Sequence, residues 1–462
     1  MRLIPIAVAF MLAIVGGFAS GPGQPAAGKP NILIIVADDL GYADVGFNGG
    51  TTIRTPNLDK LASTGVKLAD FRACPMCSPT RAGLMTGRWP LRFGVMRSVV
   101  PPWSTNGVPA AEQTLAELLA PAGYETRGIV GKWHLGHASK DMLPLGQGFT
   151  SFYGHYNGAI DYWDHTREGE TDWHRDHETV KEEGYSTDLL GAAAAGFIRN
   201  APRGKPWLLY LPFNAPHSPF QAKKEDLEKY PQLKMADKRA FAAMVDCMDQ
   251  AIGKVLAAVE QRPDAANTLI LFFSDNGGVA RVSSNAPWRG AKLTVYEGGT
   301  RVCAVMRWPA GAIQGGRTFG GRVGYIDVLP TVLAAAGARA PENLDGINFL
   351  PALLGKAPLP ERPWFSYMHQ AADAHASVHE GPWKLVAHGD FFAEKPSAPP
   401  RLELYNLETD PAESNDIASK QQAIVSRLHK ALREFGGLQK VDEKKYEFGR
   451  EGFKAPKDWM IQ

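Results

Sequence analysis

The sequence has few cysteines, almost no net charge and no long apolar run after its first residues. Its four cysteines are too few to build a disulfide scaffold in a chain of 462 residues. A net charge of +2 gives no electrostatic reason to bind nucleic acid or an anionic membrane surface. The remaining composition, 44% hydrophobic and 21% charged, is that of a globular protein with one large domain and a smaller one.

The N-terminus has the pattern of an export signal. Arg2 precedes an apolar run from Leu3 to Val15, and the small residues Gly17 and Ala19 follow. The run is shorter than the roughly 20 residues that span a bilayer, which disfavours an uncleaved anchor, and we expect no stable membrane association. We predict a signal peptide over 1–19, a flexible linker over 20–29, and a periplasmic or secreted protein, or a lysosome-like location in a eukaryote.

Continuous apolar runs alternate with helical patterns along the chain. Such runs are typical of strands that are buried on both faces, as in parallel sheets. One helix is expected from Thr55 to a stop at Gly65, and another over 244–259. Thr114 and Glu117 form a capping box for a third. The pattern predicts an α/β fold with a doubly wound, mostly parallel sheet flanked by helices. The buried strands are expected at 31–37, 128–130, 207–213 and 268–273.

The segment 355–363, GKAPLPERP, interrupts any periodic element and marks a domain boundary. Short strand-like pieces at 383–387 and 402–405 follow it, and an amphipathic helix is expected over 421–435. This pattern predicts a small α+β domain with an antiparallel sheet. The two predicted domains are a large one over 30–358 and a small one over 359–462.

Polar residues follow four of the predicted strands. Open parallel sheets bind ligands at the carboxyl ends of their strands, so these residues are expected to meet at one edge. Singly, an Asp-Asp pair is more often a cap or turn, and a lone histidine is more often structural. Together, three carboxylates and an amide carbonyl suit Ca²⁺ or Mg²⁺ and not zinc. The residues are Asp38, Asp39, Lys132, His134, His217, Asp275 and Asn276.

Cys74 and Cys77 form a C-x-x-C pair, which would suit a zinc or redox site. Neither is supported, because no second C-x-x-C completes a zinc site and the preceding sequence lacks a thioredoxin-like frame. Cys77 also begins the run Cys-Ser-Pro-Thr-Arg that ends at Arg81. Proline and arginine follow Cys77 at the positions of a C-x-P-x-R motif, and they do not follow Cys74 in this way.

Six motifs between Ala37 and Arg301 together resemble the sulfatase family of the alkaline-phosphatase-like superfamily. They are ADDLGYAD, CSPTR with TGR, GKWHLG, APHSPF, SDNGG and RGAKLTVYEGGTR. Thr80 stands where serine is commoner in the family, which leaves the C-x-P-x-R core intact. The resemblance implies a formylglycine-dependent hydrolase of sulfate monoesters.

The resemblance also implies a modified residue and a metal ion. A formylglycine-generating enzyme would convert Cys77 to formylglycine (3-oxoalanine), and one Ca²⁺ ion would be bound in preference to Mg²⁺. The implied ligands of the ion are Asp38, Asp39, the modified Cys77, Asp275 and Asn276.

A sulfate ester is an anion, so cations must offset the charge that develops as a nucleophile approaches. Lys132 and Lys292 are expected to bind the sulfate oxygens, with a hydrogen bond from His217. Arg81 is expected to hold the formylglycine oxygens. Either His217 or Lys292 protonates the leaving alcohol, and the sequence leaves that choice open.

Hydrated formylglycine has two hydroxyl groups with separate tasks. With help from Asp275, one attacks sulfur and expels the alcohol. His134 is expected to remove the proton of the other, so that the aldehyde re-forms and inorganic sulfate leaves. Glu297 is assigned a structural role.

Substrate choice is expected to depend on a ring-rich loop over 154–165. Asp161, Tyr162 and Trp163 in this loop are candidates to stack on a sugar and bond its hydroxyls; a surface loop with its own small core is the equal alternative. The loop looks most like the arylsulfatase B (N-acetylgalactosamine-4-sulfatase) branch, which implies a sulfated glycan such as 4-sulfated N-acetylgalactosamine.

Two other classes of protein would share much of this pattern. A phosphatase or phosphodiesterase of the same superfamily would share the sheet and Asp38. Those enzymes tend to use a Ser or Thr nucleophile and histidine-rich two-metal sites, whereas here Asn276 follows Asp275 and Cys77 lies in the motif. A non-enzymatic carbohydrate-binding protein is disfavoured, because every expected catalytic position is occupied.

Overall fold

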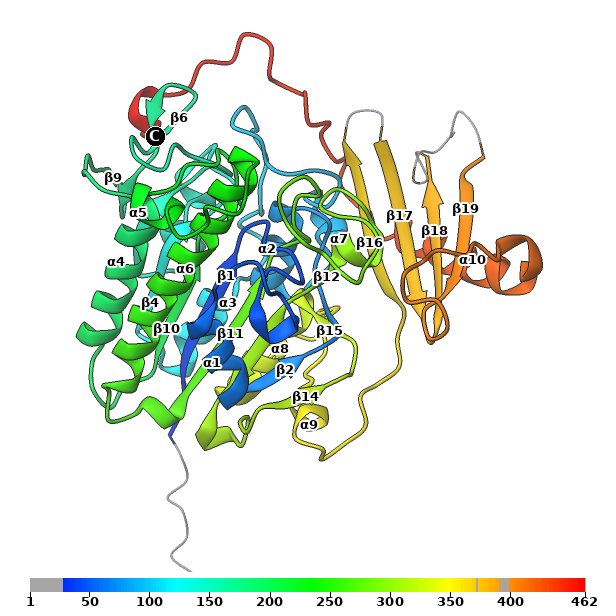
Figure 1. The fold of residues 1–462 in the computed structure, drawn as a ribbon, viewed down its shortest axis with the longest axis horizontal. Helices are drawn as coiled ribbons and strands as arrows, with labels where there is room; N and C mark the ends of the chain where they lie inside the picture. The colour runs from blue at the N-terminus through cyan, green and yellow to red at the C-terminus, as the bar shows by residue number, and fades with distance from the viewer. Residues whose placement is uncertain (1–27, 371–372, 390–391, 393–398, 462) are drawn as a thin grey trace, which may run out of the picture.

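The computed structural model describes residues 28–370, 373–389, 392 and 399–461. The signal peptide predicted over 1–19 and nearly all of the linker predicted over 20–29 lie outside the described residues. Figure 1 shows a large unit of helices around a sheet, and a small unit made of a second sheet and one helix. None of the helices in the described ranges has the length and hydropathy of a membrane span.

A sheet of ten strands forms the centre of the large unit within the described ranges. Its five central strands, β11, β1, β10, β4 and β5, are parallel, and β13 runs antiparallel to β11. The predicted doubly wound, mostly parallel sheet is therefore confirmed. In spatial order the strands are β14 (Arg317–Phe319), β2 (Val66–Leu68), β13 (Ala304–Arg307), β11 (Thr268–Ser274), β1 (Asn31–Ala37), β10 (Trp207–Pro212), β4 (Thr126–Lys132), β5 (Ser151–His155), β8 (His174–Arg175) and β9 (Glu178–Thr179).

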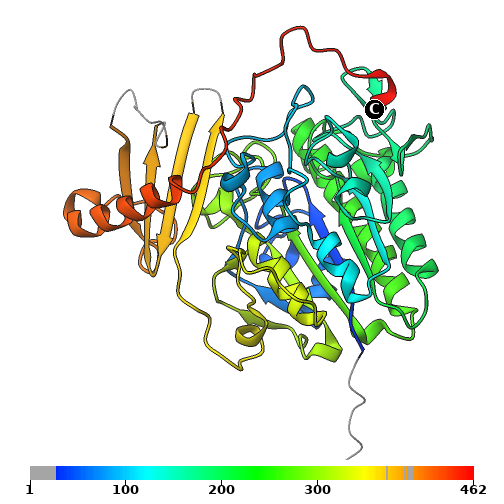
Figure 2. The same cartoon turned by 180° about the vertical axis from the view of Figure 1, so that it is seen from behind.

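Helices cover both faces of this sheet because alternate residues of each strand point to opposite sides. Leu33 and Ile35 of β1 pack into one apolar core, and Ile32 and Ile34 pack into another. Burying each such side chain contributes about 1.5–3 kcal/mol. Figure 1 labels α4 and α6 on the first face, and Figure 2 shows the opposite face with α2 in blue and α8 in yellow-green. The first face carries α1 (Pro56–Thr64), α4 (Ser186–Asn200) and α6 (Ala236–Glu260), and the second carries α2 (Cys77–Thr86), α3 (Leu115–Leu119) and α8 (Tyr325–Ala335).

The helix boundaries follow the predicted signals. Helix α1 begins after Thr55 and ends at Gly65. Helix α3 begins with the predicted capping box, in which Thr114 accepts from the Glu117 N–H and Glu117 accepts from the Thr114 N–H. Helix α6 begins earlier than the predicted 244. The remaining short elements are β3 (Phe71–Arg72), β6 (Thr166–Arg167), β7 (Glu170–Thr171), β12 (Arg301–Val302), β15 (Val323–Gly324), α5 (Lys224–Leu227), α7 (Glu297–Thr300) and α9 (Leu350–Leu353).

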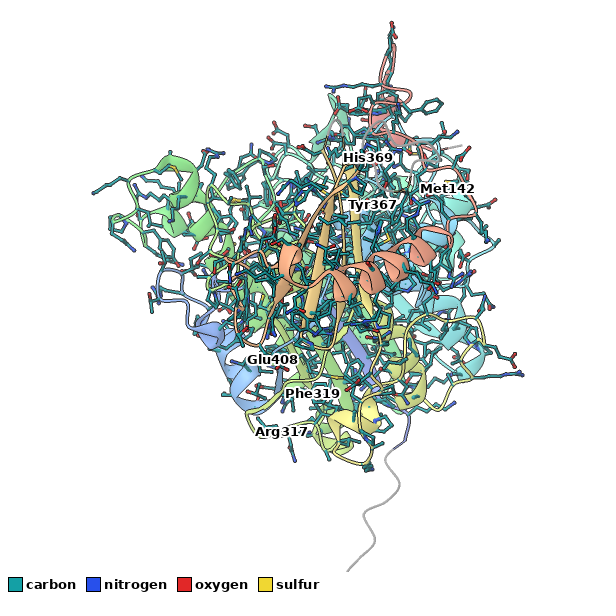
Figure 3. The ribbon with its side chains drawn as sticks, turned by 90° about the vertical axis from the view of Figure 1, so that its right-hand side faces the viewer. Met142, Arg317, Phe319, Tyr367, His369 and Glu408 are labelled. Atoms are coloured by element: carbon teal, nitrogen blue, oxygen red, sulfur yellow. The ribbon has the colours of Figure 1, made fainter. Side chains whose placement is uncertain are left out.

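The small unit is a four-stranded antiparallel sheet covered by a single helix, α10 (Gln422–Gly436). Leu428 and Leu432 of α10 pack with Val378 and Leu385 of the sheet, beside Trp89 of the large unit. Figure 3 shows α10 lying across the outer face of the sheet. Both predicted features, an antiparallel sheet and an amphipathic helix, are present. The strands are β16 (Trp364–Gln370), β17 (Asp373–Glu380), β18 (Trp383–His388) and β19 (Arg401–Asn406).

The chain does not end in the small unit. Residues 437–461, here called the C-terminal tail, leave α10 and run back over the large unit to the β6–β7 hairpin, as the red trace in Figure 1 shows. Trp459 near the end of the tail is buried. The tail therefore joins the two units at the side where the parallel strands end.

Candidate active site

The predicted polar residues lie together at the carboxyl ends of the central strands. Asp38 and Asp39 directly follow β1, and Asp275 and Asn276 directly follow the neighbouring strand β11. Lys132 is the last residue of β4. Parallel strands end at the same edge of a sheet, so these side chains converge there.

Cys77 is the first residue of α2 and is 1% exposed. Its Sγ lies 3.3 Å from Asp38 Oδ1 and 3.7 Å from Lys292 Nζ. The N-terminus of a helix carries unpaired N–H groups and a partial positive charge, which favours negative charge nearby. The thiol therefore lies between a carboxylate and a cation, at the positive end of a helix.

Three buried ion pairs among four side chains lie at the bottom of the site. Asp38 Oδ2 is 2.5 Å from Lys132 Nζ and 3.8 Å from Arg81 Nη2. Asp275 Oδ2 accepts hydrogen bonds from Nε and Nη2 of Arg81, at 2.9 and 2.7 Å. All four side chains are fully buried, so each charge depends on its partner.

Asp39 makes a second set of ion pairs and hydrogen bonds in the site. Its Oδ1 is 2.7 Å from Lys292 Nζ, and its Oδ2 is 3.7 Å from His217 Nε2. Asn276 Nδ2 donates a hydrogen bond of 2.8 Å to Asp39 Oδ1. Lys292 thus links Asp39 to Cys77, and all ten residues predicted for catalysis and metal binding lie in one site.

The donors fit a hard cation. Ligand atoms of Asp38, Asp39, Cys77 and His217 lie within 4.8 Å of one another. The Nδ2 of Asn276 donates to Asp39 and to a backbone carbonyl, whereas its buried Oδ1 has no hydrogen-bond partner within the described residues. A carboxylate cluster with a free amide oxygen has the chemistry of a Ca²⁺ or Mg²⁺ site.

Burial and neighbouring charges set the protonation of the carboxylates. Burial, together with the charge of Asp38, raises the pKa of Asp275 to about 6. Burial alone would also raise the pKa of Asp39, but the charge of Lys292, with a hydrogen bond from Asn276, outweighs it and holds that pKa below its usual value. Asp39 is therefore the more firmly ionised of the two carboxylates.

Both histidines of the site are neutral. Burial and the charge of Lys292 lower the pKa of His217 to about 3, and burial and Lys132 lower the pKa of His134 well below its usual value. Nε2 of His134 lies 3.0 Å from Val100 O, so Nε2 carries the proton. Nδ1 of His134 is then a lone-pair nitrogen, buried and without a partner in the described part of the chain. That nitrogen has the character of a base.

The Cys77 thiol is a poor nucleophile as encoded. Burial and the charge of Asp38 raise its pKa. Because the thiolate is the reactive form of cysteine, a thiol with a raised pKa stays inert at neutral pH.

Two residues of the site have left-handed backbone conformations. The φ angle is 69° at Asp39 and 58° at His134. Non-glycine residues avoid this region, at a cost of order 1–3 kcal/mol, and they persist where the surrounding structure holds them. Gly158 approaches His134 so closely that a Cβ there would lie 2.4 Å from Nε2. Gly158 and the Val100 carbonyl thus both lie against the Nε2 edge of the His134 ring.

A cavity of about 210 Å³ lies over Cys77. Among the predicted site residues, the cavity is also lined by His134, His217 and Lys292. Three further lining residues with polar side chains were not predicted from the sequence: Arg167 of β6, Gln370 of β16 and Tyr446 of the C-terminal tail. None of these three lies in a motif. Arg167 and Tyr446 belong to segments that reach the cavity only through contacts between distant parts of the chain.

The three loop residues predicted to contact the sugar do not line this cavity. Tyr162 is buried, and its hydroxyl is 2.8 Å from the carbonyl oxygens of both Asn214 and His217. Asp161 accepts hydrogen bonds from the backbone N–H groups of its own loop and from Gln221. Trp163 is 45% exposed and lines a different cavity. The structure does not bring these three to the Cys77 cavity, and their contacts support the loop and the strand end that carries His217.

A buried ion network connects the site to the small unit. Glu297, at the start of α7, is 2.6 Å from Arg72 and 2.9 Å from Lys384 of β18. Lys384 is also 2.8 Å from Glu413, whose Oε2 accepts from the Glu297 N–H. Lys292 precedes α7 on the same segment, so the small unit braces the backbone that carries it.

A doubly wound sheet with carboxylates, cations and a buried cysteine at its carboxyl edge defines an α/β enzyme that acts on an anionic group. Residues 30–338 match the family model described as Sulfatase, and residues 290–437 match the model for the C-terminal region of N-sulphoglucosamine sulphohydrolase. The chain therefore belongs to the sulfatase family and is a sulfuric ester hydrolase.

Curated relatives carry sulfatase names. N-acetylgalactosamine-6-sulfatase of Homo sapiens is 35% identical over 76% of this chain and 69% of its own length. Arylsulfatase J of Mus musculus is 29% identical over 89% of this chain and 77% of its own length. Arylsulfatase A of Bos taurus is 30% identical over 96% and 94% of the two chains.

Solved structures share the fold. The crystal structure of Ps i-CgsB in complex with k-i-k-neocarrahexaose is 33% identical, with a TM-score of 0.83 over 91% of this chain and 96% of that one. The PsFucS1 sulfatase from Pseudoalteromonas sp. is 26% identical, with a TM-score of 0.72 over 90% and 91% of the two chains. The large unit and the small unit are both covered by these matches.

Proposed function

We propose that this enzyme hydrolyses a sulfate monoester of a sulfated sugar with a formylglycine made from Cys77 and one Ca²⁺ ion. The observation that carries the proposal is the position of Cys77, at the start of α2 and within 3.3 Å of Asp38 and 3.7 Å of Lys292. The encoded thiol is inert there, and Cys77 alone begins the C-x-P-x-R motif. A formylglycine-generating enzyme is the partner that the proposal requires.

The ion would be held by Asp38, Asp39, Asp275, Asn276 and the modified Cys77. When bound, it would supply positive charge beside the sulfate and the nucleophile, and hydrated formylglycine would supply the hydroxyl that displaces the alcohol. The buried amide oxygen of Asn276 supports this ligand set.

The chain's own groups then bind the anion and move protons. Lys132 and Lys292 neutralise the sulfate oxygens, and Arg81 holds Asp275 in place at 2.7 Å. His134 accepts a proton at Nδ1, the nitrogen left free by its bond to the Val100 carbonyl. His217 and Lys292 remain the two candidates to protonate the leaving alcohol.

The substrate proposed is a sulfated hexosamine, with 4-sulfated N-acetylgalactosamine as the first candidate. One curated relative is named N-acetylgalactosamine-6-sulfatase, so the 6-sulfate is the matched comparison. The ratio of kcat/KM for the 4-sulfate and the 6-sulfate decides between them. We also propose that the segment 1–19 exports the protein to the periplasm or the medium.

The test is peptide mass spectrometry of the Cys77 peptide, from protein made with a formylglycine-generating enzyme, together with hydrolysis of 4-nitrophenyl sulfate. We expect the mass of formylglycine, and loss of activity in Cys77→Ala. Cys74→Ser is the matched control, because Cys74 is equally buried three residues before Cys77, and its thiol donates to the Tyr325 hydroxyl at 3.1 Å. It should keep both the modification and the activity.

Two results would contradict the proposal. One is a Cys77 peptide with only unmodified thiol, accompanied by full activity in Cys77→Ala. The other is faster turnover of 4-nitrophenyl phosphate than of the sulfate, which would favour the phosphatase alternative.

A further inference from the structure

Among the described residues, the cavity over Cys77 is lined by two permanent cations, Lys292 and Arg167, and by no carboxylate. Lys292 lies beside Cys77, and Arg167 is contributed by the β6–β7 hairpin. The other lining residues are mostly small or apolar, among them Val100, Pro101 and Leu293. Such a cavity suits a ligand that has an apolar face and more than one anionic group.

The Arg167 guanidinium is available to a ligand. Arg167 lines the cavity with a side chain that is 28% exposed, and its Nε is buried and, within the described residues, makes no hydrogen bond. Nε is 3.3 Å from Oε1 of the adjacent Glu168, whose side chain is 40% exposed. Exposed ion pairs of this kind contribute little, so an anion with two oxygens can compete for the guanidinium.

The C-terminal tail holds the hairpin that carries Arg167. Trp459 is buried, and its indole N–H donates a hydrogen bond of 2.9 Å to the carbonyl of Arg167. The N–H of Asp458 donates to Glu170 Oε2 at 2.9 Å, so the tail is tied to both strands of the hairpin. Figure 1 shows the two segments side by side.

The tail also contacts the wall of the cavity. The carbonyl of Tyr446, itself a lining residue, accepts a hydrogen bond of 2.7 Å from the Trp103 indole. The His137 ring packs edge-on against Trp459 at 5.3 Å, and its Nε2 is 2.9 Å from the carbonyl of Pro102, another lining residue. One segment thus positions Arg167 and supports the wall beside it.

We propose that Arg167 binds a second anionic group of the substrate, a sulfate ester or a carboxylate on the same glycan, while the scissile sulfate lies at Cys77. Trp459 is the positioning residue that holds Arg167 in place. This inference rests on the proposed function and adds to it the preference for a substrate with two anionic groups.

The experiment compares three substrates. 4-Nitrophenyl sulfate has one anionic group, a hexosamine disulfate has two sulfates, and a sulfated hexosamine linked to a uronic acid adds a carboxylate. We expect the unchanged enzyme to have a higher kcat/KM for at least one of the two dianionic substrates. In Arg167→Gln, KM for that substrate should rise about tenfold with kcat unchanged, because a charge-assisted bidentate contact is lost. KM for 4-nitrophenyl sulfate should change less than about twofold.

Arg175→Gln is the matched control. Arg175 lies in the same region, is 57% exposed, pairs with Glu182 and does not line the cavity. The Arg175→Gln enzyme should have the same KM as the unchanged enzyme for all three substrates. The dianionic substrate that shows the larger effect of Arg167→Gln identifies the second group as sulfate or carboxylate.

Trp459→Phe tests the positioning role. It removes the indole N–H but keeps a ring against His137, so KM for the dianionic substrate should rise about threefold, less than in Arg167→Gln. The double variant should show no more than the Arg167→Gln effect, because both changes act through one guanidinium. A general loss of structure would instead lower kcat for every substrate.

Several results would overturn the inference. An unchanged enzyme without preference for either dianionic substrate would do so, as would an equal effect of Arg167→Gln on all three substrates or no effect on any. If 4-nitrophenyl sulfate is hydrolysed normally while the selective effect is absent, only this inference fails. If no sulfate ester is hydrolysed at all, the proposed function fails with it.

Discussion

The two ends of the Asn276 amide have different surroundings. Its Nδ2 donates to Asp39 and to the Gly277 carbonyl, whereas its Oδ1 is buried and, in the described part of the chain, has no partner. Buried polar atoms nearly always make a hydrogen bond, so an exception beside two carboxylates points to a ligand.

Asn276→Ala is expected to weaken Ca²⁺ binding, because it removes that oxygen. In the unchanged protein, Ca²⁺ at 100 times its dissociation constant should stabilise the fold by about 2.7 kcal/mol, and a chelator should reverse the effect. Differential scanning calorimetry with and without Ca²⁺ measures this shift directly. Asn276→Asp keeps an oxygen ligand and should keep the shift. A full Ca²⁺ shift in Asn276→Ala would show that the amide is not a ligand.

At the scale of single residues, the site was predictable where a side chain directly follows a buried strand. Asp38, Asp275 and Asn276 were found in this way, because strand ends fix their position in space. Arg167 and Tyr446 carry no comparable signal. They reach the cavity through a short hairpin and a tail whose paths depend on contacts that are distant in the sequence.

Among the elements, the segment from Lys292 through α7 is the one most dependent on its neighbours. Glu297 is bonded by Arg72 from the large unit and by Lys384 from the small unit, and all three side chains are buried. Removing one member of a buried ionic network leaves the others without compensation. The small sheet therefore stabilises the segment that carries Lys292.

Lys384→Met should destabilise the protein by about 3–5 kcal/mol, because Glu413 and Glu297 lose a buried counter-ion. Urea unfolding followed by tryptophan fluorescence measures this change. Lys60→Met is the matched control, since Lys60 pairs with Glu260 on the surface, where both side chains are more than half exposed. Its unfolding midpoint should hardly move. Equal midpoints for the two variants would contradict a stabilising network.

Elements were predictable according to their length and burial. The strands at 31–37 and 268–273 are continuous apolar runs, and the structure has strands there. The three strands at one side of the large sheet, β13, β2 and β14, were missed because three or four residues are too short to show a period. Their pairing depends on the sheet already formed, which local sequence does not encode.

At the scale of the whole molecule, the C-terminal tail connects the small unit to the far side of the large unit. It starts at the small unit and ends at the β6–β7 hairpin, with Glu443 as an anchor on the way. Oε1 of Glu443 accepts from the Met96 N–H at 2.9 Å, and burial raises the pKa of this carboxyl to about 8 despite the nearby Arg97.

Glu443 should make stability fall as the pH rises. Its pKa is about 8 in the folded protein and near 4.5 in the unfolded chain, so between these values the folded protein holds a proton that the unfolded chain has released. Its stabilising contribution is complete below about pH 4.5 and is lost as the pH rises through about 8. Glu443→Gln should remove that dependence.

The measurement is the urea unfolding midpoint at pH 5, 6.5 and 8. The advantage of Glu443→Gln over the unchanged protein should grow with each step in pH. Asp442→Asn, a neighbouring exposed carboxyl in the same tail, is the control and should show no such trend. Parallel pH profiles for the unchanged protein and Glu443→Gln would place the cause of any pH dependence elsewhere.

The burial of Cys77 also limits the time during which an enzyme can reach its side chain. Its side chain is 1% exposed, α2 is covered by α8, and Lys292 closes over the thiol from a segment made more than two hundred residues later. A modifying enzyme could not bind residues 77–81 once α8 and the segment that carries Lys292 have packed against α2. Under the proposed function, conversion of Cys77 would therefore compete in time with folding, and a molecule that folded first would keep an unmodified, inactive cysteine.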